Sequence, residues 1–200
     1  MSEFIGTKLT MNLGERSYDI IIKSGSLENL YQFARLDRRV AVVTDSGVPA
    51  QYAQMVADQC KDATIITVPQ GEASKSMKIL ESVLRQMLEF NMGRGDLVIA
   101  VGGGAIMDLC KLLGCKRPDT VHNLYFKRFP VVHEKDVIAI PTTCGTGSEC
   151  TNISVAIVKD EKDGVLTGGE TKLGLVSDDI IPNKVCLIPD LLKTCLLYTS

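Results

Sequence analysis

Three consecutive glycines, Gly102, Gly103 and Gly104, separate an apolar run at residues 96–101 from an amphipathic segment at residues 105–115. This order predicts a buried strand that turns directly into a helix. The first turn of a helix has N–H groups without intrahelical partners and carries a partial positive charge, so it attracts phosphate. Glycine has no Cβ that would keep a pyrophosphate away from that backbone. The three glycines therefore predict a pyrophosphate cradle, although the dinucleotide fingerprint GxGxxG is absent.

Short apolar runs alternate with segments of helical spacing along the whole chain. Such alternation predicts an α/β fold, a Rossmann-like parallel sheet with helices on both faces. Strands are expected at residues 18–23, 39–43, 63–68, 96–101, 137–140 and 185–188, and helices at residues 51–60, 77–90 and 105–115.

Polar or glycine-rich segments follow several of these strands, at residues 44–46, 70–72, 102–104 and 141–149. In a parallel sheet these segments share one edge, where ligands bind. Two alternatives are ordinary tight turns and, for residues 141–149, a turn before a helix that Ser148 caps. The candidate ligand contacts in and beside these segments are Asp45, Gly71, Glu72, Asp108, Thr142, Thr143, Thr146 and Ser148.

Composition excludes several classes of partner. A net charge of -2 and a pI of about 5.7 argue against binding to nucleic acid or to anionic membranes. No apolar run approaches the roughly 18–20 residues of a membrane span. The seven cysteines contain no CxxC pair, which disfavours a zinc cage and favours reduced thiols in the cytoplasm.

Residues 9–104 resemble 3-dehydroquinate synthase. The resemblance is carried by LGERSYDI (residues 13–20), VVTD (42–45), PQGEASKS (69–76) and GDLVIAVGGG (95–104). It implies that NAD is held by the glycine turn and by Gly71, Glu72 and Lys75.

Residues 102–193 instead resemble the iron-containing alcohol dehydrogenases, most nearly their 4-hydroxybutyrate dehydrogenase-like branch. The matching stretches are GGGAIMDLCK (102–111), IPTTCGTGSECTN (140–152) and KLGLVSDDIIPNKVCLIPDLL (172–192). A synthase should have glycine where Met107 stands and a Gly-Gly-Lys loop after its threonines, whereas Lys111 fits the dehydrogenase pattern GGGxxxDxxK. Both families are expected to combine an N-terminal NAD domain with a C-terminal helical metal domain.

The change of resemblance predicts a join near residues 102–105, within one NAD-binding domain that spans residues 1–193. Either the chain is a natural recombinant, or two sequence reads were joined at related stretches; we expect the second. The last six residues, CLLYTS (195–200), match a translation of a sequencing-library adapter, so we expect them to be non-native. The C-terminal metal domain is then missing from this sequence.

The resemblances also imply roles for the candidate residues. Asp45 and Glu72 would accept hydrogen bonds from ribose hydroxyls, Lys75 would position the cofactor, and Lys172 would reach a ribose. Thr142 and Thr143 would contact the nicotinamide half. In both families the ligands of the divalent metal, iron or zinc, are expected beyond residue 200. His122 and His133 lie in a stretch, residues 117–136, that reads as a surface connection, and they lack the paired spacing of metal ligands.

The function implied is oxidation of an alcohol by NAD beside a divalent metal, which this chain alone is not expected to complete. One alternative is 3-dehydroquinate synthase, and another is a non-catalytic NAD-binding module. A small-molecule substrate is expected as the partner. Whether the protein is a homo-oligomer, whether it prefers NAD to NADP, and which alcohol it would oxidise stay open.

Overall fold

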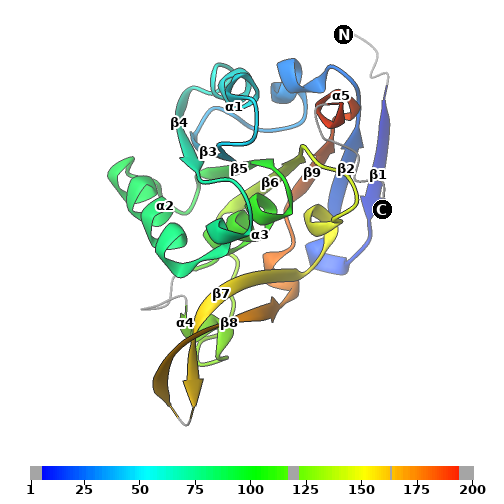
Figure 1. Cartoon of the computed structure of the whole chain (residues 1–200). Coiled ribbons are helices and arrows are strands. Elements are labelled where there is room, and N and C mark those ends of the chain that lie inside the picture. The colour runs from blue at the N-terminus through cyan, green and yellow to red at the C-terminus, as the bar shows by residue number, and fades with distance from the viewer. Residues whose placement is uncertain (1–5, 117–121, 163, 194–200) are drawn as a thin grey trace.

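The computed structural model describes residues 6–116, 122–162 and 164–193. Its main sheet has the order β1-β2-β9-β6-β5-β3-β4, and Figure 1 shows helices on both sides of it. All neighbouring strands in this sheet are parallel except the edge strand β1, which is antiparallel to β2. Its strands are β1 (Thr7–Met11), β2 (Tyr18–Ile22), β3 (Arg39–Asp45), β4 (Asp62–Val68), β5 (Leu97–Gly102), β6 (Asp136–Pro141) and β9 (Lys184–Leu187). The α/β fold with a mostly parallel sheet is thus confirmed.

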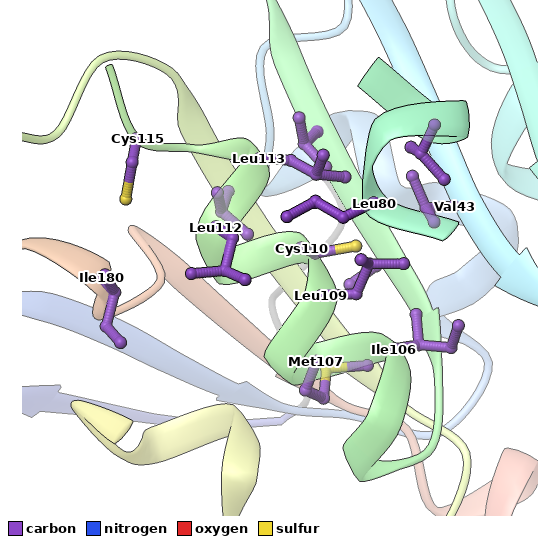
Figure 2. Packing of buried hydrophobic residues seen from close by; sticks show 14 of the residues in the cluster. Val43, Leu80, Ile106, Met107, Leu109, Cys110, Leu112, Leu113, Cys115 and Ile180 are labelled. Atoms are coloured by element: carbon purple, nitrogen blue, oxygen red, sulfur yellow. The ribbon is translucent and has the colours of Figure 1, made fainter. Parts of the chain in front are cut away.

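The two faces of the sheet are covered by different helices because buried strand residues alternate in direction. On one face, Val40 and Val42 pack with Ala53 and Val56 of α1 (Ala50–Ala57). On the other face, β3 and β5 pack against α2 (Met77–Glu89) and α3 (Gly104–Leu113). Figure 2 shows Val43, Leu80 and the apolar side chains of α3 in this second layer. Both layers are apolar enough to fix the register of the central strands.

A second sheet consists of β7 (Ile153–Lys162) paired antiparallel with β8 (Val165–Val176). This hairpin extends away from the main sheet in Figure 1. Ser154, Ala156 and Val158 of β7 are buried, and Ala156 and Val158 belong to the core that contains α3. The sequence did not predict these strands, because most β8 side chains are exposed and give no apolar run.

The prediction that residues 117–136 form a surface connection is wrong in part. Residues 117–121 lie outside the described residues, but α4 (His122–Tyr125) follows and buries Leu124 and Tyr125. The Tyr125 hydroxyl lies 3.2 Å from Ser154 Oγ of β7. The hairpin that the sequence did not reveal thus provides the surface against which α4 packs.

The remaining elements are short. They are the 3-10 helices η1 (Gly14–Arg16), η2 (Ser26–Gln32), η3 (Glu72–Lys75), η4 (Ser148–Cys150) and η5 (Asp178–Ile180), and the helix α5 (Pro189–Leu192). The longest helix described is α2, with 13 residues. Within the described part of the chain, no helix has both the length and the apolar character that crossing a membrane requires.

Candidate cofactor site

The carboxyl ends of four parallel strands meet at one edge of the sheet. Asp45 at the end of β3 is paired with Val68 at the end of β4, and Gly102 at the end of β5 is paired with Pro141 at the end of β6. The loops that follow these strands contain most of the candidate residues. The edge is therefore the place where a bound ligand would contact several loops at once.

The three glycines differ in what surrounds them. A Cβ on Gly102 would lie 2.6 Å from Ile106 Cγ1, so this glycine lets α3 turn back closely onto β5. A Cβ on Gly103 or Gly104 would instead lie 3.3 Å from side-chain atoms of Thr143 or Thr146. These two glycines thus place the backbone at the start of α3 directly beside two hydroxyl-bearing residues. Binding of a pyrophosphate at this helix start stays a prediction.

The threonine loop, residues 142–148, is anchored to the glycine turn at its first residue. The backbone N–H of Thr142 donates to the carbonyl oxygen of Gly102 over 2.9 Å. Gly145 and Gly147 have φ values of +93° and +64°, a region that side-chain-bearing residues rarely adopt. Thr142 is buried, Thr143 is half-buried and Thr146 is exposed. From Thr142 to Thr146, the threonines of the loop are therefore increasingly exposed to solvent.

Ser148 does not cap a helix, which contradicts that alternative. The residue before η4 is Gly147, and it makes no side-chain capping bond. The Ser148 hydroxyl donates instead to Asp108 Oδ1 over 2.6 Å. Both Ser148 and Asp108 are buried. Their hydrogen bond lies inside the protein, and direct contact of either side chain with a cofactor stays a prediction.

A line of charged side chains connects η3 to α3. Lys75 Nζ lies 3.0 Å from Glu72 Oε1 and 3.1 Å from Asp108 Oδ2. Lys172 of β8 lies 3.0 Å from the other oxygen of Glu72. Hydrogen bonds from Lys172 and then from Lys75 lower the pKa of Glu72 below its usual range. Glu72 is therefore a carboxylate at neutral pH, and an acceptor of the kind that ribose hydroxyls need.

Asp45 closes a tight turn at the end of β3. Its Oδ1 accepts a hydrogen bond from the Gly47 N–H over 2.8 Å, and a Cβ on Gly47 would collide with the side chain of Gln70. The neighbouring Thr44 Oγ1 is buried and has no hydrogen-bond partner among the described residues. A buried hydroxyl without a partner is costly, and this one sits at the edge where a nucleotide is predicted.

The described residues do not form a metal site. In this part of the chain, no three His, Cys, Asp or Glu side chains come together as metal ligands do. His122 lies 3.0 Å from Glu161 and stacks on Phe126, while His133 lies 3.2 Å from Asn183. Burial lowers the pKa of His133. Both histidines have partners within the protein, and these residues do not fit a catalytic metal.

Comparison with known families agrees with this fold. Residues 17–189 match the family model described as iron-containing alcohol dehydrogenase. The chain belongs to the iron-containing alcohol dehydrogenase family. It therefore has an NAD-dependent dehydrogenase-like fold, within a group of enzymes that also includes the synthases described next.

Two curated relatives carry different names. The chain is 36% identical over 123 residues to 4-hydroxybutyrate dehydrogenase of Clostridium kluyveri, a match that covers 62% of this chain and 30% of that protein. It is 29% identical over 196 residues to 3-dehydroquinate synthase of Streptococcus mutans, covering 94% of this chain and 48% of that protein. At most, then, the chain spans about half the length of these two relatives. Since a synthase matches along nearly the whole chain, the join near residues 102–105 stays a prediction.

A solved structure shares the fold. The crystal structure of 2-deoxy-scyllo-inosose synthase complexed with carbaglucose-6-phosphate, NAD+ and Co2+ matches with a TM-score of 0.69 and 18% identity. The match covers 93% of this chain and 47% of that one. At this identity the likeness concerns the fold alone.

One residue close to the site was missed by the sequence-based selection. Lys111, three residues after Asp108 on α3, is buried, and its ammonium lies 3.2 Å from Ser148 Oγ. The signal was present in the sequence, because Lys111 stands between Cys110 and Leu112 in an otherwise apolar segment. A lysine in such a segment indicates either a long side chain that reaches solvent or a buried, paired charge.

Proposed function

We propose that this chain is the NAD-binding part of a metal-dependent alcohol dehydrogenase. The observation that carries the proposal is the start of α3, where Gly103 and Gly104 leave the backbone bare beside Thr143 and Thr146. An N–H-rich helix start at the carboxyl end of a parallel sheet is suited to a pyrophosphate. The Clostridium kluyveri relative, named for oxidation of a hydroxy acid, supports a small alcohol as the substrate class.

Different residues would bind different parts of the cofactor. Gly102, Gly103 and Gly104 would form the pyrophosphate cradle, and Thr142 and Thr143 would orient the nicotinamide half. Asp45 and Glu72 would accept ribose hydroxyls, while Lys75 and Lys172, both paired with Glu72, would keep that carboxylate in place. NAD supplies the hydride acceptor when it is bound. Because the described residues provide no metal ligands, we expect this chain to bind NAD without turning over an alcohol.

A second candidate function is 3-dehydroquinate synthase. It is favoured by the stretch PQGEASKS, which forms η3 with Glu72 and Lys75 beside the site. It is disfavoured by Met107, which is buried in the core of α3 where the synthase pattern requires glycine. A full-length protein continuing from this chain would separate the two, since one oxidises an alcohol and the other eliminates phosphate.

The substitution Gly103→Val tests the cradle. Branched carbons at this position would press on Thr143, already 3.3 Å from the Cβ position, and would displace the loop that borders the proposed cradle. We expect NAD affinity, measured by isothermal titration calorimetry, to fall at least tenfold, about 1.4 kcal/mol. The matched control is Gly95→Val, just before the opposite end of β5, where a Cβ would meet nothing within 4 Å. Unchanged affinity in a folded Gly103→Val protein would remove the cradle assignment.

A further inference from the structure

Lys111 places a positive charge inside the protein. The residue is 1% exposed, and its Nζ donates to Ser148 Oγ over 3.2 Å, Thr151 Oγ1 over 3.0 Å and the carbonyl oxygen of Ile153 over 2.7 Å. An ammonium group has three N–H donors. All three of its hydrogen bonds therefore go to one short segment, residues 148–153.

This segment begins at the last residue of the threonine loop and ends where β7 begins. At its other end the loop is tied to the glycine turn by the Thr142 N–H. Between these two anchors lie Gly145 and Gly147, both at positive φ. Glycine has more backbone freedom than any other residue and loses more of it when a chain becomes ordered. The loop therefore depends on its anchors for a defined conformation.

Asp108 completes the second anchor. It accepts from Ser148 Oγ over 2.6 Å and lies 3.1 Å from Lys75 Nζ of η3. Lys111 Nζ lies 3.7 Å from the same carboxylate. Since Ser148 donates to Asp108, its oxygen is free to accept from Lys111. Lys111 and Asp108 thus both hydrogen-bond Ser148. Through its contact with Lys75, Asp108 also joins η3 to the end of the threonine loop.

A charge buried in this way is costly unless it is fully paired. An apolar residue at position 111 would fill the same core of α3, which is apolar at most neighbouring positions. The location of the three acceptors suggests a role other than core stability, because Ser148 is the last residue of the threonine loop and Thr151 and Ile153 follow it closely.

We propose that Lys111 is a positioning residue, which holds the threonine loop over the start of α3 and thereby raises the affinity for NAD. The inference rests on the proposed function. In this proposal Lys111 acts through the loop, because its ammonium bonds Ser148, Thr151 and Ile153. Lys111 keeps the loop ordered before NAD binds. The entropy cost of ordering the loop on binding is therefore smaller, which raises the affinity.

The test compares Lys111→Met with Tyr125→Phe. Tyr125→Phe removes a buried hydroxyl near Ser154 and leaves the contacts of Lys111 intact, so it controls for general loss of stability. We expect Lys111→Met to weaken NAD binding at least tenfold and to speed amide hydrogen exchange in residues 142–151 at least tenfold. Exchange in β3 and β5 should stay unchanged, and Tyr125→Phe should alter neither NAD affinity nor exchange in the loop.

The pH dependence of binding gives a second readout. Burial lowers the pKa of Lys111 to about 8, although Asp108 opposes the shift. The groups facing its ammonium are Asp108 from α3, Ser148, Glu149 and Cys150 from η4, and Thr151 and Ile153 beyond it. A neutral amine has two N–H groups and cannot serve three acceptors. NAD affinity of the unsubstituted protein should therefore fall between pH 7 and 9.5, while that of Lys111→Met should change less.

The outcomes separate the two proposals. If Lys111→Met binds NAD as tightly as the unsubstituted protein, or is weakened only as much as Tyr125→Phe, Lys111 has no positioning role. If the unsubstituted protein does not bind NAD, the proposed function fails, while faster loop exchange in Lys111→Met would still identify the anchor. If Lys111→Met does not fold, Thr151→Val, which removes one acceptor, decides instead. We expect this variant to bind NAD threefold to fivefold more weakly. An unchanged NAD affinity in Thr151→Val would overturn the inference.

Discussion

At the scale of single residues, an added side chain meets different surroundings at each of the three glycines. On Gly102 a Cβ would lie 2.6 Å and 2.8 Å from two carbons of Ile106, which is itself fully buried in the core. On Gly103 the nearest atom would be Thr143 Oγ1 at 3.3 Å, which belongs to a loop. The first glycine is thus required by helix packing, and the second by the loop and its predicted ligand.

Gly102→Ala should therefore cost more stability than Gly103→Ala. The new methyl group at position 102 forces Ile106 or the start of α3 to move, and overpacking of this kind costs about 1–3 kcal/mol. At position 103 a shift of a few tenths of an ångström in Thr143 accommodates the methyl group. Urea denaturation of both variants measures the difference, and equal losses of unfolding free energy would contradict this division.

Lys111 should also make stability depend on pH. Because its pKa is lowered from 10.5 to about 8 in the folded protein, the unfolded chain binds one more proton between these pH values. The contribution of Lys111 to the unfolding free energy therefore rises as the pH rises from 8 to 10.5, by up to about 3 kcal/mol. The unfolding free energy of the unsubstituted protein minus that of Lys111→Met should therefore increase over this pH range. A difference that is constant between pH 7.5 and 10 would contradict the assigned pKa.

At the scale of elements, the sequence predicts those strands and helices whose apolar pattern is complete. Residues 97–101 of β5 are buried on both faces and form an unbroken apolar run, and α2 has a regular apolar stripe through Leu80, Val83 and Met87. The β7–β8 hairpin has no complete pattern of this kind, because residues 155–158 of β7 are apolar but most β8 side chains are exposed. The edge that gathers the candidate site could therefore be predicted, since it follows from the central strands alone.

The contacts among the buried polar residues behind the site could not be predicted from the apolar pattern. Asp108 and Ser148 were selected as ligand contacts, and the structure places them in a buried arrangement with Lys75 and Lys111. These residues are far apart in the chain, and their contacts depend on where η4 and β7 lie against α3. Local patterns carry no information on that placement.

The start of α2 gives a prediction at this scale. Ser76 is the residue before the helix, and its Oγ accepts from the Ile79 N–H over 3.4 Å. Loss of such a cap costs about 0.5–2 kcal/mol, and the long distance places Ser76→Ala near the lower value. The control is Ser82→Ala on the exposed side of the same helix, which should be neutral or slightly stabilising because alanine favours helices. Chemical denaturation that ranks the two variants in the opposite order would contradict this role of Ser76.

At the scale of the whole molecule, the sheet interleaves the early and late parts of the chain. In the order β1-β2-β9-β6-β5-β3-β4, the strands β9 and β6 separate β2 from β5 and β3. Ile20 and Ile21 of β2 are paired with Val185 and Cys186 of β9. Whatever the origin of the predicted join near residues 102–105, the parts on its two sides form one sheet.

A chain that ends at residue 104 should accordingly not fold. It would retain β1 and β2 but lose β6 and β9. The strand β2 would then have no parallel neighbour, and the edge of β5 that pairs with β6 would be exposed to water. We expect such a chain to show neither near-ultraviolet circular dichroism nor a cooperative thermal transition, whereas the 200-residue chain should show both. A cooperative transition in the shorter chain would mean that the interleaved strands are dispensable.

The central claim is that the edge formed by the ends of β3, β5 and β6 binds NAD. Titration of isotope-labelled protein with NAD, followed by two-dimensional NMR, tests it most directly because it reports binding and location together. We predict progressive shifts of backbone amide signals at residues 102–106 and 142–148, with smaller changes near Asp45. No shifts at millimolar NAD, or shifts confined to the far end of the sheet, would contradict the account.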